Sequence, residues 1–343
     1  MRMKKRYDTI SIVLLVLSML LAGCQQDDSA DQISRVPIRL STSIGTEEGV
    51  TRASLQAYLI NEGLNFSNGQ NIALFICESD GTNDIDVTEE NQTKLTYQGQ
   101  QIATTTQTDG SSYFTLTYND GLTRYWPDTN NRLSFYAWYP ASAFSGLTVD
   151  ATPVITIPVD QSTDAAYAAK DLMMASLTHQ VRTPDAQTLN FSHSLSKVIV
   201  ILKSTNGSIS EDLMNNASVK LLKGDAETSI LLDAEVNLKT GTATAVSDGT
   251  STEEFTIGTG KNTFAVLPTM QSLVNKKISV TMNGKEQSYA ITSITNLLAG
   301  KKYTFTIDLI SARQDFAGTL SVSVSDWNNP AEGQDLVDQR LTL

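Results

Sequence analysis

The sequence predicts an all-β protein, and three patterns support this fold class. Apolar residues recur at every second position in many short runs, which is the period of a strand with one buried face. Serine and threonine occupy the alternate positions, and glycine, asparagine and aspartate separate the runs, as in antiparallel sheets. Long segments with the apolar stripe of a helix are missing. We therefore expect mostly antiparallel sheets stacked into β-sandwiches.

Predicted strands follow one another along most of the chain. The first covers residues 36–44, where Val36, Ile38, Leu40 and Ile44 share one parity. Further strands with the same alternation are expected at residues 114–118, 133–139, 278–282 and 303–309, with a returning strand at residues 285–291. Residues 198–202 are apolar at every position, which predicts a strand buried on both faces. The Asn283-Gly284 pair between two of them is a strong hairpin signal. One short helix is expected around residues 55–64.

The first 24 residues carry a pattern of export rather than of folding. A basic start precedes the apolar run 10–21, which is too short to span a bilayer. This arrangement predicts a signal peptide, residues 1–23, that is removed from the mature protein. The sequence Leu21-Ala22-Gly23-Cys24 resembles the bacterial lipobox, which implies that Cys24 is lipidated and anchors the precursor to the outer membrane. An ordinary secretory signal that ends near a cysteine is the alternative.

Length and composition predict two domains. The 343 residues, less the signal peptide, suffice for about two domains of ordinary size, and 40% hydrophobic residues with 18% charged residues indicate a globular chain. A polar stretch with a proline near residues 180–188 predicts the border, so that residues 53–185 form one sandwich and residues 186–343 the other. The net charge of −12 disfavours nucleic acid as a partner, because phosphate binding needs an electropositive face.

No pattern for catalysis or metal binding emerges, so we expect no enzyme, no metal site and no cofactor. The histidines, His179 and His193, lack metal-ligand spacing, and His193 shares the parity of a buried strand face. Cys77 lies in an apolar run and is interpreted as a small buried hydrophobe. The aromatic residues from Tyr113 to Tyr139 fit either a sandwich core or an exposed sugar platform, and their alternation favours the core.

Five segments together resemble one protein family. They are Tyr125-Trp126-Pro127, the run from Leu133 to Pro140, the run from Lys170 to Ala175, the run from Phe191 to Val198, and the run from Leu298 to Phe305. With the lipobox, this ordered set resembles the fimbrillin family of Bacteroidales, the lipoprotein subunits of type V pili. The resemblance implies two β-sandwich domains of transthyretin-like or immunoglobulin-like character, a fimbrial location at the cell surface, and other fimbrial subunits as partners.

The resemblance also implies a mechanism of assembly. In such pilins an arginine-specific protease removes an early strand, and the neighbouring subunit supplies a replacement. Here residues 24–52 would be the tether and removable strand, with Val36, Ile38 and Leu40 as its apolar row, and Arg52-Ala53 would be the cleaved bond. The donor would be the tail 335–343, through Val337, Leu341 and Leu343, although the tail also fits a closing strand of its own domain.

Two functions therefore stay open at this point. One is a structural subunit of the fimbrial shaft or base, which polymerises. The other is a tip adhesin or surface glycan binder of the same fold, with a host glycan or protein as its ligand.

Overall fold

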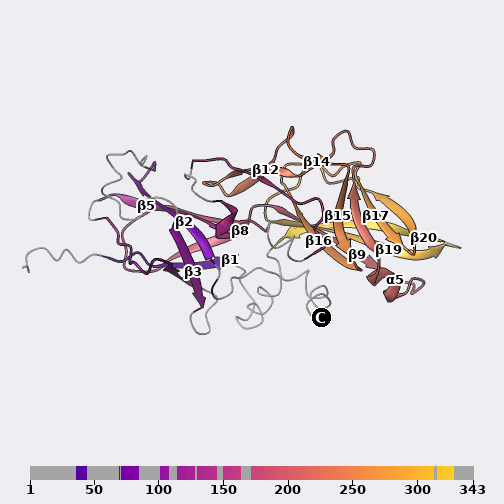
Figure 1. The fold of residues 1–343 in the computed structure, drawn as a ribbon, viewed down its shortest axis with the longest axis horizontal. Coiled ribbons are helices and arrows are strands. Elements are labelled where there is room, and N and C mark those ends of the chain that lie inside the picture. The colour runs from indigo at the N-terminus through magenta and orange to yellow at the C-terminus, as the bar shows by residue number, and fades with distance from the viewer. Residues whose placement is uncertain are drawn as a thin grey trace, which may run out of the picture.

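The computed structural model describes residues 36–44, 69, 71–84, 101–107, 114–127, 130–144, 150–163, 171–312 and 315–327. Within these ranges the protein is almost entirely β-structure, with strands of the early chain at one end of an elongated molecule and strands of the late chain at the other (Figure 1). Most neighbouring strands run antiparallel, so the predicted fold class is confirmed. The helix expected around residues 55–64 lies outside the described residues.

The early part of the chain closes into a seven-stranded barrel. Its strands, in spatial order, are β1 (Leu40–Ile44), β4 (Phe114–Tyr118), β3 (Gln101–Gln107), β2 (Asn71–Ser79), β5 (Arg132–Tyr139), β7 (Met173–Gln180) and β8 (Gln187–His193). The ring closes because β1 pairs with β4 on one side and with β8 on the other. A short 3₁₀ turn, η2 (Ala141–Ala143), follows β5. The sequence predicts stacked sheets, whereas the described strands of the barrel form a closed ring in which each strand has a neighbour on both sides.

The later part of the chain stacks two four-stranded sheets. One contains β15 (Glu254–Thr259), β10 (Ser218–Leu222), β17 (Lys277–Met282) and β18 (Lys285–Ala290), and the other contains β16 (Asn262–Leu267), β9 (Ser196–Lys203), β19 (Lys301–Ala312) and β20 (Asp315–Asp326). The short helix α5 (Glu211–Asn215) begins where the Ser210 Oγ accepts a hydrogen bond from the Leu213 N–H, as an N-cap residue does. The hairpin predicted at Asn283-Gly284 is confirmed, and both residues have positive φ.

Two small sheets complete the fold, and strand pairing crosses the predicted border at residues 185 and 186. One small sheet contains β13 (Thr242–Ala245), β12 (Asp233–Asn237) and β6 (Val154–Thr156), and the other pairs β11 (Ile230–Leu231) with β14 (Ser251–Thr252). Strand β6 precedes that border in sequence but pairs with β12 of the later part. Strand β8 follows the border but closes the barrel. The border itself stays a prediction.

Two hydrophobic cores share one wall of the barrel. Along β2, Leu74 faces the barrel interior, whereas Phe75 faces the core of the stacked sheets. Along β5, Phe135 and Trp138 divide in the same way. This follows from the two-residue period of a strand, because consecutive side chains point to opposite faces. The wall of β2, β5 and β7 is therefore apolar on both faces, which matches the run of buried residues in β2.

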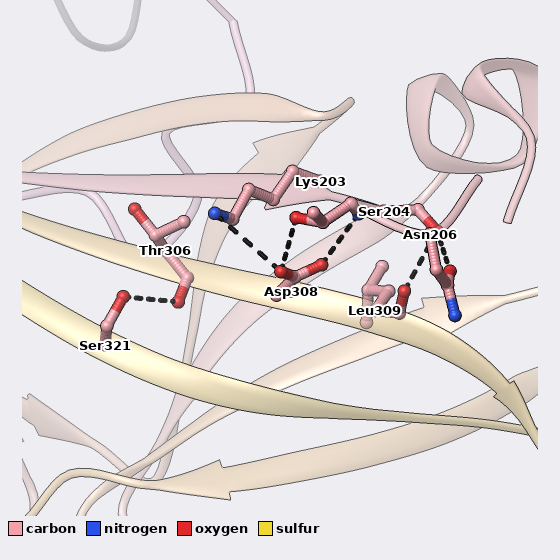
Figure 2. Close-up of polar contacts among 8 residues, drawn as sticks. Lys203, Ser204, Asn206, Thr306, Asp308, Leu309 and Ser321 are labelled. Atoms are coloured by element: carbon pink, nitrogen blue, oxygen red, sulfur yellow. Dashed lines mark hydrogen bonds and ion pairs between the residues drawn. The ribbon is translucent and has the colours of Figure 1, made fainter. Parts of the chain in front are cut away.

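A parallel pair of strands lies in the stacked sheets and is tied by a polar network. Strand β19 runs parallel to β9 from Lys302 to Asp308. Asp308 lies between Lys203 and the segment 204–206 (Figure 2), where it accepts bonds of 2.9 Å from the Thr205 N–H and 2.5 Å from the Thr205 hydroxyl. The Ser204 hydroxyl donates to the Leu309 carbonyl at 2.9 Å. These contacts attach the end of β9 to β19 by side chains as well as by the sheet.

Candidate functional site

The slot that holds β1 is the candidate site, because β1 completes the barrel from both sides. Strand β1 pairs antiparallel with β4, where Ser41 faces Thr115, and parallel with β8, from Leu40 opposite Gln187 to Ile44 opposite Phe191. The residues ahead of it are also tied by backbone bonds: the Ile38 N–H donates to the Arg124 carbonyl at 2.8 Å. The strand predicted at residues 36–44 is thus held along most of its length.

Side chains of β1 and the residues just before it enter the barrel core. Ile38 is 5% exposed and Leu40 is 3% exposed, and both lie in the cluster of buried residues inside the barrel. Val36 is partly buried and packs against the same cluster, whereas Arg39 is exposed. Each fully buried side chain of this kind contributes about 1.5–3 kcal/mol of hydrophobic stabilisation. The apolar parity predicted for this strand is therefore the parity that faces the core.

One inward position of β1 is polar. The side chain of Thr42 is fully buried, and its Oγ1 has no hydrogen-bond partner among the described residues. On the other parity, the Ser41 Oγ lies 3.0 Å from the Thr188 Oγ1 of β8. A buried hydroxyl without a partner costs free energy, so the slot contains one position that β1 fills imperfectly.

Strand β8 depends on β1 for most of its sheet bonds. Its register with β7 covers two residue pairs, Met173 with His193 and Met174 with Ser192. The preceding residues of β8, Gln187 to Phe191, pair with β1 along their whole length. Without β1, the backbone groups of this segment that face the slot would lose their partners, because an unpaired strand edge is a template for another strand.

A second border of the slot is fixed by a buried arginine. Arg124 is 4% exposed, and its guanidinium lies 2.5 Å from the Asp120 Oδ2 and 4.7 Å from the centre of the Tyr118 ring. The hydrogen bonds from Arg124 hold the pKa of the Asp120 carboxyl below its usual value. These contacts of Arg124 hold the segment 124–126 in place. That segment borders the slot, because the Arg124 carbonyl accepts a hydrogen bond from the Ile38 N–H and the Trp126 N–H donates one to the Val36 carbonyl. Sequence reasoning missed this role of Arg124, since a single arginine in a loop carries no periodic signal.

The structure places only part of the predicted site. Val36, Ile38 and Leu40 lie in the slot, as described above. Six other predicted residues lie outside the described residues: Cys24, Arg52, Ala53, Val337, Leu341 and Leu343. The border formed by β8 was not predicted as part of the site, although the alternation of Leu189, Phe191 and His193 marked it as a strand.

The other residues considered as candidates, a histidine, a cysteine and two tryptophans, are buried in the protein interior. His193 is buried, with its Nδ1 2.6 Å from the Asp171 Oδ1 and its ring stacked on Trp327 at 3.7 Å. Burial raises the pKa of the Cys77 thiol to about 12, which suits a buried hydrophobe rather than a nucleophile. Trp126 and Trp138 are buried, so these two rings belong to cores and not to an exposed platform.

The described ranges contain neither a cluster of metal-ligating side chains nor a membrane-spanning helix. No group of three or more His, Cys, Asp or Glu side chains in those ranges could hold a metal ion. Within the same ranges no helix is long and apolar enough to cross a bilayer.

Comparison with known proteins decides the family. The model of the fimbrillin-like family matches residues 51–327, which is most of the chain. The chain belongs to the fimbrillin-like family. No curated protein matches this fimbrillin.

Solved structures share the fold of this fimbrillin. A protein of Bacteroides uniformis, described as a candidate cell adhesion protein, has 20% sequence identity and a TM-score of 0.60, with 85% of this chain and 98% of that chain covered. A protein of Bacteroides ovatus with the same description has 21% identity and a TM-score of 0.60 over 85% and 98% of the two chains. At this identity the likeness concerns the fold alone. The family resemblance drawn from the sequence motifs is confirmed by the family match.

Proposed function

We propose that this fimbrillin is a structural subunit of a cell-surface fimbria and polymerises by exchange of its first strand. The observation that carries the proposal is the setting of β1, which contributes Ile38 and Leu40 to the barrel core and pairs with a strand on each side. A segment placed in this way leaves an apolar slot with two open strand edges when it is removed. Such a slot accepts another strand, because backbone groups and apolar pockets both need to be filled.

The proposal assigns roles to the predicted residues outside the described ranges. Export and lipidation at Cys24 would deliver the chain to the outer membrane. Cleavage of the Arg52-Ala53 bond would then free β1 together with the anchor. Arg39 lies directly before the residues that pair with β8, so cleavage after it would leave residues 40–44 in the slot. The tail around Val337, Leu341 and Leu343 of a neighbouring copy would supply the new strand.

Controlled cleavage tests this function. The full secreted chain is treated with an arginine-specific protease, and the product is analysed by size-exclusion chromatography and electron microscopy. We expect filaments from the wild type and uncleaved monomers from Arg52→Ala. The matched control Arg39→Ala, which changes an exposed arginine directly before β1, should be cleaved and assemble like the wild type.

Two outcomes would contradict the proposal. A cleaved chain that has lost β1 and stays monomeric at high concentration would exclude strand exchange and favour the tip-adhesin function. For the anchor, Cys24→Ala should abolish labelling with radioactive palmitate. Persistent labelling of that variant would exclude lipidation at this cysteine.

A further inference from the structure

The inward row formed by β1 and the residue two before it, Ile38, has an order that a replacement strand must match. At two-residue intervals it reads Ile38, Leu40 and Thr42, which is apolar, apolar and polar. All three side chains are at most 5% exposed. A charged or amide side chain at either apolar position would be buried among apolar neighbours at considerable cost. A polar side chain at the position of Thr42 replaces a group that is already polar.

The tail has one apolar row, and that row contains one interior polar residue. Its members at two-residue intervals are Asp335, Val337, Gln339, Leu341 and Leu343. When this row runs in the direction of β1 and fills all three inward positions, either Gln339 or Asp335 takes an apolar position in every register. When the row runs in the opposite direction, one register places Leu343, Leu341 and Gln339 at the positions of Ile38, Leu40 and Thr42. No other register in either direction gives the order apolar, apolar and polar.

We propose that the tail of a neighbouring copy enters the slot in the direction opposite to β1, with Leu343, Leu341 and Gln339 in the places of Ile38, Leu40 and Thr42. This inference rests on the proposed strand exchange and defines its donor by polarity and register. The longer border of the slot, formed by β8, then changes from a parallel to an antiparallel pairing. The shorter border, formed by β4, changes in the reverse sense from antiparallel to parallel. Antiparallel pairing is slightly more stable per residue, so the change favours the exchanged state only to the extent that the β8 border is the longer one.

The register also gives a reason for Gln339. Its side chain carries both an acceptor and two donor hydrogens on a longer stem than threonine has. It therefore brings more hydrogen-bonding groups, and a longer reach, to a position where the Thr42 hydroxyl has no partner among the described residues. On the outer parity, Arg340 comes to the place of Ser41 and Asp338 to the place of Ser43. Both charged residues then lie on the face where the exposed Asn190 of β8 also lies.

Cysteine cross-linking distinguishes the two directions. Asn190 faces position 43 of β1 and Thr188 faces position 41. One population of the cleaved full chain carries Asn190→Cys or Thr188→Cys, and a second carries Asp338→Cys, Arg340→Cys or Thr342→Cys. After mixing and mild oxidation, we expect disulfides between positions 190 and 338 and between positions 188 and 340. The residue number of the cross-linked tail position thus rises by two when the number of the β8 position falls by two, as expected for an antiparallel pair.

Controls separate this inference from the proposed function. Cys77 is buried, and Cys24 leaves with the removed segment, so the wild-type mixture should form no disulfide. Peptides of residues 335–343 with a cysteine at 338, 340 or 342 replace the tail variants if one of those chains folds poorly. Filaments that cross-link position 190 to position 340 or 342 would overturn the proposed register and leave strand exchange standing. If the tail position also rises as the probe position rises (188 to 338 with 190 to 340, or 188 to 340 with 190 to 342), the polarity is overturned as well. A cleaved wild type that neither assembles nor binds the peptide would overturn both.

Discussion

Among the described strands, each half of the molecule contains one parallel pair, and the two pairs differ in how firmly they are tied. In the later half, β19 lies between β9 and a full-length antiparallel partner, β20, which pairs with it from Lys301 to Ala312. Asp308 and Ser204 add side-chain bonds across that pair. In the barrel, β1 lies between β8 and β4, but its register with β4 covers only Ser41 and Thr42.

This difference supports the proposal that β1, and not β19, is the strand that leaves. Removal of β19 would split the stacked sheets, because it joins β9 to β20 and contributes the fully buried Phe305. Removal of β1 opens the ring between β4 and β8. The other six strands remain paired to their neighbours around the barrel. The polar tie across the β1–β8 seam is a contact between two hydroxyls, Ser41 and Thr188. Strand β19 thus lies in the interior of its sheet, whereas β1 closes a barrel whose other strands are paired without it.

The largest expected effect is on the permanent strand. Phe305→Ala removes a side chain with no exposed surface from β19, so it should lower the free energy of unfolding by about 3–5 kcal/mol. Because β19 is present before and after cleavage at Arg52, urea denaturation should detect the loss in both forms. The exposed control Thr319→Ala should change stability by no more than about 0.5 kcal/mol. An effect confined to one form would contradict the contrast between the strands.

A change in the removable strand should matter in only one form. Leu40→Ala should destabilise the uncleaved chain by about 2–5 kcal/mol, since Leu40 is buried in the barrel core. The cleaved protein, which lacks β1, should be unaffected, and Arg39→Ala should be nearly neutral in both. Equal losses before and after cleavage would show that β1 stays in its slot.

A smaller effect should come from the hydroxyl contact across the barrel seam. Ser41→Ala removes the partner of Thr188, so the uncleaved chain should lose about 0.5–1.5 kcal/mol of stability, measured as a shift in the urea midpoint. Ser323→Ala on the exposed face of β20 is the matched control. A loss as large as that of Leu40→Ala would mean that polar bonds, rather than core burial, hold β1.

The smallest effect should be the pH dependence of the tie between β9 and β19. The Thr205 backbone N–H, followed by its hydroxyl, holds the pKa of Asp308 below the ordinary value of 3.8. A carboxyl with a lowered pKa in the folded state stabilises the protein above the unfolded-state pKa, and this contribution is lost as the pH falls through the folded-state pKa. The advantage of the wild type over Asp308→Asn should therefore be constant above about pH 4 and shrink below it. Urea midpoints measured between pH 7 and pH 2 would show this, and a constant difference would contradict it.

Much of the fold could be predicted because strands leave a local signature. The alternation in residues 36–44, 133–139 and 303–309 depends only on which neighbours in sequence are apolar, and the structure places strands in all three segments. The Asn283-Gly284 hairpin is local in the same sense, since its turn needs positive φ at both residues. Long-range pairing carries no such signature.

The sequence by itself therefore determined the β class, the hairpin and the apolar parity of the first strand, because each of these depends on neighbouring residues. Only the tertiary structure decided that β1 runs parallel to β8, that β6 pairs beyond the predicted border, and that Arg124 fixes one side of the slot. Gln187 lies far from Leu40 along the chain, yet the two face each other in the sheet. Such partners are chosen by the packing of the whole barrel, and no period within a single strand records that choice.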